Sequence, residues 1–267
     1  MGLREAFASV VASPGTLVPV LRNDPGEVQA RFGLSDAELA VLAGVDGDSY
    51  AFMAEESGAK RRIHLSVGIP RTVGELTEHH SGVLDTFLTT TTLREDPDDP
   101  MGVVQACEQL LAFGGLPPAT ADFGRFELDQ YLLLGDSVAA EACRPGRFAQ
   151  SAERLPQSAE PPLILSPAVR VATYGHDVTD PGAPVRLPRV EVTVLLQRVW
   201  DAPLRAYRIG AGTGLLLAGC DGTRTGREAA GAADLPEAEA LSLLERLVSG
   251  DIVRAAPAVV HQGRPTS

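Results

Sequence analysis

The chain has 267 residues, of which 23 are Lys or Arg and 35 are Asp or Glu, so its formal net charge is −12. This length holds one large or two small domains, and a hydrophobic fraction of 44% is ordinary for a folded protein. The acidic excess disfavours binding to nucleic acid. No run of 18 apolar residues occurs, and the first residues begin no signal-peptide pattern. We therefore expect no membrane partner and a cytoplasmic location.

The first part of the chain carries signals for short helices. Ser35 and Glu38 have the spacing of a capping box, and Asp24 with Glu27 has the same spacing earlier in the chain. Helix-like composition continues through four further segments: 49–67, 73–89, 103–113 and 119–142. Consecutive threonines are unfavourable in a helix, so Thr89–Thr92 is expected to belong to a loop. We predict an all-helical domain over residues 1–145 and a polar, proline-containing linker over 146–162.

Leu163 opens a segment with a different pattern. Three strand-like stretches are followed by three helix candidates: 165–173, 190–199 and 204–209, then 212–220, 225–232 and 235–249. In the middle stretch Val190, Val192, Val194 and Leu196 alternate with other residues, as in a sheet with one buried face. The sequence therefore predicts an α+β fold. A three-strand, three-helix winged-helix domain over 163–257 follows the helical domain, and residues 258–267 form a flexible tail.

Charge is distributed unevenly between these two parts. From Leu163 onward there are 11 basic and 11 acidic residues, which leaves 12 basic and 24 acidic residues in the first 162. The densest basic cluster is Lys60-Arg61-Arg62, which we interpret as a solvated helix face. The predicted winged-helix domain is neutral, and the helical domain carries the whole acidic excess.

A search for catalytic groups favours a binding protein. Glu75 and His79 are four residues apart on a presumed helix, but exposed or hydrogen-bonding histidines explain them better than a metal site does. The three cysteines, Cys107, Cys143 and Cys220, form no CxxC pair. The segment Gly210–Gly214 lacks the Lys-Ser/Thr ending of a phosphate loop, so a strand-to-helix turn is the better interpretation. We predict no catalytic residue, metal ligand or cofactor in this chain.

Two stretches of the C-terminal domain resemble a known module. Leu204-Arg205-Ala206-Tyr207-Arg208-Ile209 with Leu215–Thr225, and the later run Leu241–Val253, are similar to the PqqD-like winged helix. This module is called the RiPP recognition element, and it captures the leader peptides of ribosomally made, modified peptides.

Segments further upstream resemble narrower groups. Leu116–Leu128 and Leu165–Arg170 are similar to partner proteins of multinuclear non-haem iron oxidases in RiPP biosynthesis, including the non-catalytic subunit of methanobactin biosynthesis. Leu21–Leu39 resembles the small helical subunit of aromatic ring-opening dioxygenases. In the partner family a helical N-terminal domain precedes a recognition-element-like C-terminal domain.

The resemblance implies a non-enzymatic partner protein that forms a heterodimer with an iron-dependent oxidative enzyme and presents a precursor peptide to it. The iron would belong to that enzyme. An exposed edge strand has unpaired backbone N–H and C=O groups that an extended peptide can pair as an added strand. We expect the third strand to be this edge and the last helix to lie beside it, with arginines that pair acidic leader side chains. The predicted peptide-binding residues are Leu204, Arg205, Ala206, Tyr207, Arg208, Ile209, Ala240, Leu243, Arg246 and Leu247.

Two alternatives stay open at this point. The first is a winged-helix DNA-binding transcriptional regulator, although its recognition helix 235–249 contains three glutamates and only Arg246 as a base. The second is a stand-alone metalloenzyme that uses His79, His80 and nearby carboxylates.

Overall fold

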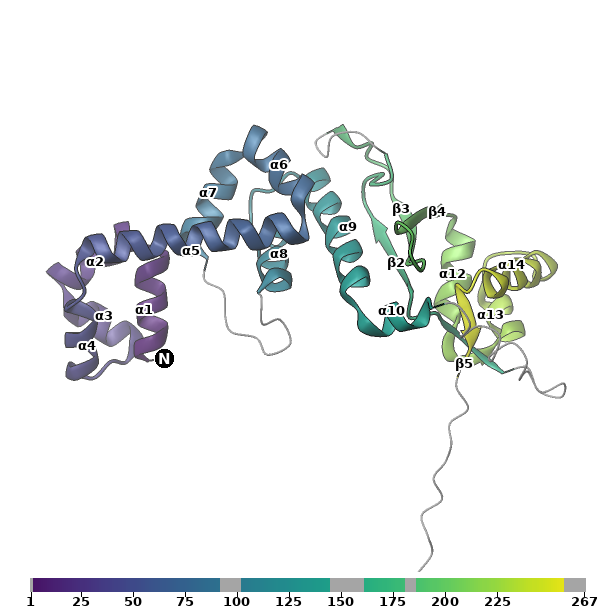
Figure 1. The fold of residues 1–267 in the computed structure, drawn as a ribbon, viewed down its shortest axis with the longest axis horizontal. Coiled ribbons are helices and arrows are strands. Elements are labelled where there is room, and N and C mark those ends of the chain that lie inside the picture. The colour runs from purple at the N-terminus through teal and green to yellow at the C-terminus, as the bar shows by residue number, and fades with distance from the viewer. Residues whose placement is uncertain (1, 92–101, 145–160, 181–185, 257–267) are drawn as a thin grey trace, which may run out of the picture. The chain divides into compact units, whose positions relative to one another are not determined.

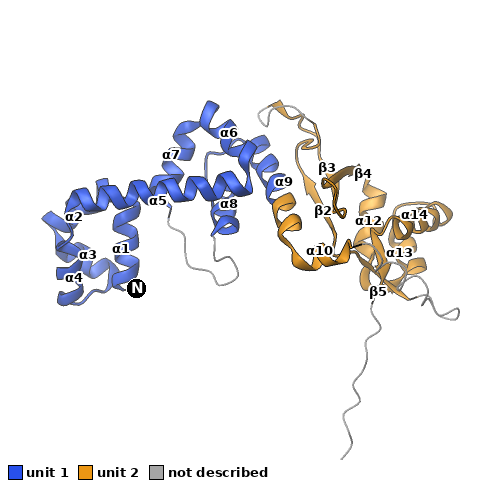
Figure 2. Cartoon of the chain, viewed as in Figure 1, with its two compact units in different colours: residues 1–128, 183–185 blue, residues 129–182, 186–267 orange. Residues whose placement is uncertain are grey.

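The computed structural model describes residues 2–91, 102–144, 161–180 and 186–256 (Figure 1). The chain divides into two compact units, unit 1 with residues 1–128 and unit 2 with residues 129–182 and 186–267 (Figure 2). No described helix is long and apolar enough to cross a membrane.

Unit 1 is helical, as predicted for the N-terminal part of the chain. Its helices are α1 (Leu3–Ala12), α2 (Pro14–Asn23), α3 (Pro25–Phe32), α4 (Asp36–Ala43), α5 (Gly47–Gly68), α6 (Pro70–His79), α7 (Ser81–Thr90), α8 (Val103–Leu111) and the first part of α9 (Pro118–Gly135). The capping box of Ser35 and Glu38 is confirmed at the start of α4. The side chain of Asp24 caps α3 by accepting a hydrogen bond from the backbone N–H of Glu27 at 3.2 Å.

Three local predictions for unit 1 differ from the structure. The segment 73–89, expected to be one helix, is divided between α6 and α7 at His80. The loop predicted over Thr89–Thr92 begins later than expected. Thr89 and Thr90 lie inside α7, where their hydroxyls donate to the carbonyls of Asp85 and Thr86 one turn earlier, at 2.9 and 2.7 Å, whereas Thr91 follows the helix in an extended conformation and Thr92 lies outside the described residues. Arg61 is buried, although we expected a solvated helix face. Its guanidinium donates to the carbonyl of Leu88 and to the hydroxyl of Ser57. Burial lowers the pKa of Arg61.

Unit 2 contains the strands. Its elements after α9 are α10 (Ser137–Ala142), β1 (Pro162–Leu165), β2 (Val169–Tyr174), β3 (Val192–Gln197), β4 (Arg205–Ile209), α12 (Ala211–Gly219), β5 (Asp221–Thr225), α13 (Gly226–Ala232), α14 (Glu237–Ser249) and β6 (Val253–Ala255). The strands form two antiparallel three-stranded sheets with the orders β5-β1-β6 and β2-β3-β4. The predicted α+β class is confirmed, but the prediction of a single three-stranded sheet is wrong.

The second sheet arises because a further strand, β1, precedes the predicted strand 165–173, which corresponds to β2 except for Leu165 at the end of β1. The chain turns between Leu165 and Val169, where the N–H of Val169 donates to the carbonyl of Ser166 at 2.9 Å. β1 then pairs with β5 and β6, two short strands that the sequence analysis did not predict. The turn therefore sends β1 and β2 into different sheets.

Both faces of β3 are buried, so the expected one-sided sheet is also wrong. Leu195 packs into an apolar core with Val169 of β2 and with side chains of α12, α13 and α14. Val192, Val194 and Leu196 point to the opposite face and are also buried. Tyr174 pairs with Val192 and therefore lies on that opposite face, where its hydroxyl donates to Asp129 of α9 at 2.5 Å. The C-terminal part of α9 thus lies at the second face of this sheet.

The boundary between the units lies inside α9, earlier than the domain end that we predicted at residue 145. Residues 129–144 join unit 2 through specific bonds. Arg198 donates to the carbonyls of Leu133, Leu134 and Asp136, at distances of 3.2, 2.7 and 2.9 Å. The predicted linker lies outside the described residues except for 161 and 162, and the predicted tail lies entirely outside them.

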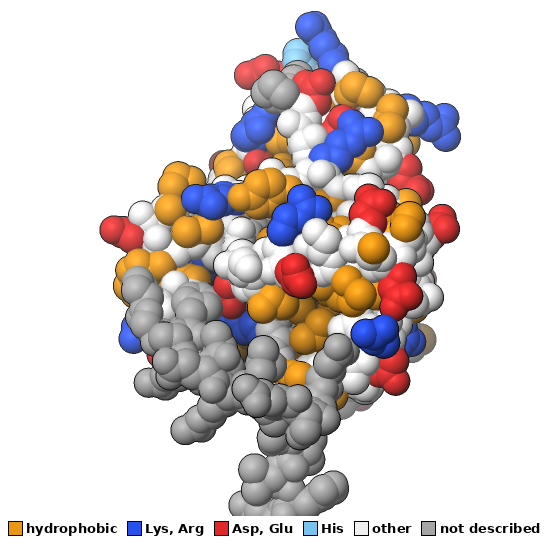
Figure 3. All heavy atoms as spheres, turned by 90° about the vertical axis from the view of Figure 1, so that its right-hand side faces the viewer, with side chains coloured by type: hydrophobic (Ala, Val, Ile, Leu, Met, Phe, Trp, Pro, Cys, Tyr) orange, Lys and Arg blue, Asp and Glu red, His pale blue; other side chains and the backbone are white. Residues whose placement is uncertain are grey.

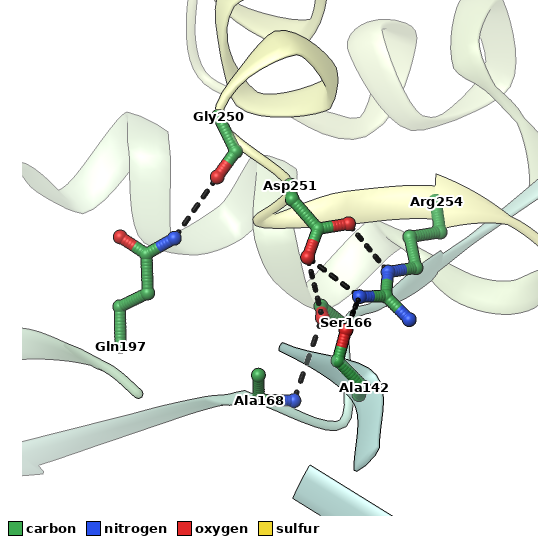
Figure 4. Close-up of polar contacts among 7 residues, drawn as sticks. All are labelled: Ala142, Ser166, Ala168, Gln197, Gly250, Asp251 and Arg254. Carbon is green, nitrogen blue, oxygen red and sulfur yellow. Dashed lines mark hydrogen bonds and ion pairs between the residues drawn. The ribbon is translucent and has the colours of Figure 1, made fainter. Parts of the chain in front are cut away.

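A polar junction connects α10, the turn after β1, the end of α14 and β6 (Figure 4). Arg254 forms two bonds of 2.5 Å with the carboxylate of Asp251 and donates to the carbonyl of Ala142 at 2.7 Å. Ser166 lies beside the same carboxylate at 3.5 Å. Asp251 has a φ of 55°, a left-handed conformation that Asp adopts more readily than most residues. The junction fixes the place where α14 ends and β6 begins.

Candidate functional site

The strand β4 forms an edge of the sheet β2-β3-β4. It pairs with β3 along one side, from Arg205 opposite Gln197 to Ile209 opposite Thr193. Within the described parts of the chain, no strand pairs with its other side. The backbone groups of that outer side are therefore available to an added strand.

The side chains of β4 are accessible. Arg205, Ala206, Tyr207 and Arg208 are exposed, and Ile209 is half-buried. Residues directly opposite each other in an antiparallel pair point to the same face. Because Tyr207 lies opposite Leu195, the side chains of Arg205, Tyr207 and Ile209 share the face that α12–α14 cover, whereas Ala206 and Arg208 point to the other face. Leu204, just before β4, is half-buried.

The C-terminal end of α14 lies close to the start of β4. Gln197 of β3 donates its side-chain amide to the carbonyl of Gly250 at 2.9 Å (Figure 4). The same Gln197 lies opposite Arg205, and Gly250 follows the turn of α14 that contains Arg246. This link brings Arg205 and Arg246 to the same end of the edge strand. Neither arginine has an ion-pair or hydrogen-bond partner that involves its side chain among the described residues.

The four predicted residues of α14 differ in what they can contact. Ala240 and Leu247 are buried in the core of unit 2, where they pack beside Leu216 and Leu244. Leu243 is half-buried at the margin of that core, and Arg246 is exposed. Leu243 and Arg246 can therefore meet a ligand directly, whereas Ala240 and Leu247 position the helix.

Arg208 has an intramolecular partner that the sequence analysis missed. Its guanidinium pairs with the carboxylate of Asp177 at 2.8 Å. The other oxygen of Asp177 accepts bonds from the backbone N–H and the hydroxyl of Thr179, at 3.2 and 2.5 Å. The Asp-x-Thr spacing is a sequence signal for this local turn, but nothing local identifies Arg208 as the partner. Gln197 was missed for the same reason, since its bond to Gly250 joins distant segments.

The loop 210–214 is a strand-to-helix turn, as predicted. β4 ends at Ile209, and α12 begins at Ala211. A Cβ atom at Gly212 would lie 2.8 Å from the side chain of Leu235, so glycine allows close packing of α12 there. Gly212 therefore has a packing role that requires no phosphate.

The residues considered for other chemistry lie elsewhere. Glu75 and His79 approach to 4.0 Å on α6. In the described ranges, no group of three or more His, Cys, Asp or Glu residues is placed to hold a metal ion. All three cysteines are buried, and none of them forms a disulfide. Burial and the nearby Asp221 raise the pKa of Cys220 to about 11, which leaves its thiol protonated at neutral pH.

The surface at the α14 end of unit 2 mixes hydrophobic, basic and acidic side chains without a large field of one sign (Figure 3). Exposed hydrophobic residues of unit 2 include Tyr207 on β4, Leu215 on α12 and Val248 on α14.

No model of a known protein family matches this chain, and no curated protein matches it.

Proposed function

We propose that this protein is a non-catalytic peptide-binding partner. It binds the leader of a ribosomally made precursor peptide as an added strand at β4 and presents that peptide to an iron-dependent oxidative enzyme. The β2-β3-β4 sheet with α12, α13 and α14 would then be a winged-helix module of the RiPP recognition element type. β1, β5 and β6 would form a second small sheet beside it.

One observation carries the proposal: β4 is an edge strand with an exposed surface and with the end of α14 at its side. Backbone pairing along β4 supplies affinity for any extended chain, and side chains that flank the edge supply selectivity. Leu243 and Tyr207 offer apolar contact on the side of α14. The edge and the helix together make a suitable peptide site.

The two arginines at one end of the edge favour an acidic side chain of the peptide at that end. Arg205 and Arg246 lie at one end of the edge, and β4 itself contains no acidic residue. An acidic side chain next to these guanidinium groups forms charge-assisted hydrogen bonds. A second β4 strand in the same position would instead bring arginines near one another. An acidic leader therefore suits this edge better than a second copy of β4.

The DNA-binding alternative is less favourable on electrostatic grounds. Glu237, Glu239 and Glu245 are exposed on α14, where a recognition helix would need to face phosphates. Arg246 is the one basic residue on this helix. DNA would meet a net negative helix surface.

The direct test is capture from native cell extract with tagged full-length protein, followed by mass spectrometry. We expect recovery of a short peptide together with an iron-dependent enzyme. The peptide should be lost with Arg205→Glu and with Leu243→Asp. Arg227→Glu on α13 is a matched control, because Arg227 is exposed and, within the described ranges, pairs with Glu237 alone. Equal recovery by Arg205→Glu and Arg227→Glu would contradict binding at β4.

A further inference from the structure

The long helix α5 of unit 1 has one face that no other described element covers. Phe52, Ile63 and Val67 are 63%, 61% and 53% exposed. Together with Glu56 and Ala59 they recur every three or four residues, so they lie in one row along the helix. We call these five residues the α5 row. Large hydrophobic side chains that recur along one helix in this way are unlike the single ones scattered over most surfaces.

The opposite side of α5 is fully engaged within unit 1. Tyr50 is buried in the core shared with α1–α4, and its hydroxyl donates to the carbonyl of Leu42 at 2.7 Å. Further along, Leu65 is buried, and Gly68 lies against Cys107 of α8. These contacts fix the rotation of the helix about its axis. The exposure of the α5 row is therefore imposed by the core on the other side.

The exposed side of α5 is complementary to itself when the helix direction is reversed. Glu56 of the row and Lys60, one turn later on the same side of the helix, are both exposed, and they lie two residues before and two residues after position 58. Phe52 and Ile63 stand at nearly equal distances on either side of Gly58. Among the described residues, neither Glu56 nor Lys60 takes part in an ion pair.

We propose that α5 pairs with α5 of a second copy of this chain, antiparallel, about a two-fold axis that crosses the α5 row at the level of residue 58. In such a pair each flank of one helix faces the same flank of the other, at positions reversed about the axis. Glu56 then faces Lys60 of the second copy, and Lys60 faces Glu56 of the second copy. Phe52 packs against Ile63 of the second copy, and the small side chain of Ala59 lets the helices approach.

The symmetry of charge and size indicates that the partner of α5 is a second copy of this chain. Isologous contacts require that one surface complement itself, and the positions of Glu56 with Lys60 and of Phe52 with Ile63 meet this requirement. Like charges would oppose each other if the two helices were parallel, with Glu56 beside Glu56 and Lys60 beside Lys60. The pairing is therefore antiparallel. It is independent of the proposed peptide site, which lies in unit 2.

Sedimentation velocity on the full chain, over a range of concentrations up to about 100 µM, tests the pairing. We expect a reversible dimer. Glu56→Lys and Lys60→Glu each place like charges opposite one another twice, so each variant alone should dimerise at least about tenfold more weakly. Glu78→Lys on α6 is the matched control, because Glu78 is exposed and lies outside the row, and it should leave the dimer unchanged.

Mixing the two single variants gives the decisive result. A Glu56→Lys chain and a Lys60→Glu chain are complementary to each other at both contacts, so their mixture should recover the dimer as a heterodimer. Circular dichroism should show equal helix content in all the variants. A chain that stays monomeric over the whole concentration range would overturn the proposal. A dimer that the single variants do not weaken, or that mixing does not restore, would do the same.

Discussion

Charged side chains hold distant segments of unit 2 together. Asp129 accepts a bond from the Tyr174 hydroxyl and pairs with Arg170 at 2.7 Å, and Arg198 holds the last carbonyls of α9. Arg254 does the same for α10 through the carbonyl of Ala142. A buried donor without an acceptor is costly, so each of these bonds makes the surrounding arrangement specific.

Replacing Asp129 with alanine should destabilise unit 2 by about 2 kcal/mol, because the buried Tyr174 hydroxyl loses its hydrogen bond to this carboxylate. Arg170 is half-exposed, so water can hydrate its guanidinium once Asp129 is removed, and the lost ion pair adds little to the destabilisation. Urea unfolding monitored by the fluorescence of Trp200, the only tryptophan, reports on unit 2. Asp129→Asn keeps an acceptor and should cost less. Equal losses for the two variants would contradict this account.

Cys220 should resist alkylation in the native protein. Its pKa of about 11 leaves little thiolate at pH 8, and its side chain is buried. Iodoacetamide followed by mass spectrometry should label it slowly until urea exposes it. The unfolded thiol releases its proton near its ordinary value of 9, before the folded one does. The free energy of unfolding should therefore fall as the pH rises from 9 to 11. The difference in unfolding free energy between the wild type and Cys220→Ala should therefore change with pH over this range. A difference that stays constant would argue against the raised pKa of Cys220.

At the scale of elements, the local signals predicted most helices, and the non-local contacts explain what was missed. The capping box of Ser35 and Glu38 is a contact over three residues, so sequence alone identifies it. β5 and β6 are short, and they form by pairing with β1, which is far away in the chain. Both faces of β3 are buried for the same reason, because they are covered by helices that lie far from β3 in the sequence. One face lies toward α9, at the start of unit 2, and the other toward α14, near its end.

In the candidate site, too, the sequence predicted the arrangement of neighbouring elements but not the contacts between distant residues. The edge position of β4 follows from chain order, because α12 begins directly after it. The pairing of Arg208 with Asp177 and the burial of Ala240 and Leu247 depend on tertiary packing. Because Ala240 and Leu247 are buried and Arg208 is paired, fewer than the ten predicted residues are directly available to a ligand.

The start of α6 should depend on Glu127 of α9. Its carboxylate accepts bonds from the N–H groups of Arg71 and Thr72 at 3.0 and 2.9 Å and from the Thr72 hydroxyl at 2.7 Å. A carboxylate is favourable at a helix N-terminus, where backbone N–H groups are unpaired. Glu127→Ala should destabilise unit 1 by about 2 kcal/mol. Hydrogen exchange should accelerate in α6 and not in β3, and unchanged protection of α6 would contradict the role.

The three arginines of the site should differ in their effect on peptide affinity. Arg205 and Arg246 are unpaired among the described residues, whereas Arg208 must first release Asp177. Arg205→Gln should therefore weaken binding of the captured peptide about tenfold and Arg208→Gln only a few-fold. Fluorescence anisotropy with a labelled synthetic copy of that peptide measures both. A larger loss from Arg208→Gln would mean that the peptide displaces Asp177.

At the scale of the whole molecule, the two proposed surfaces lie in different units. The α5 row belongs to unit 1, and β4 with the end of α14 belongs to unit 2. Substitutions in the α5 row should therefore leave peptide capture intact, and Arg205→Glu should leave self-association intact. The two proposals can fail separately.

Hydrogen exchange on the complex isolated from native extract tests the central claim most directly. An added strand takes up the outer N–H groups of β4, so slower exchange is predicted across Arg205–Ile209 when the peptide is bound. β2, at the other edge of the same sheet, should exchange as it does in the free protein. Protection of β2 or of unit 1 with no change in β4 would contradict peptide binding at this edge.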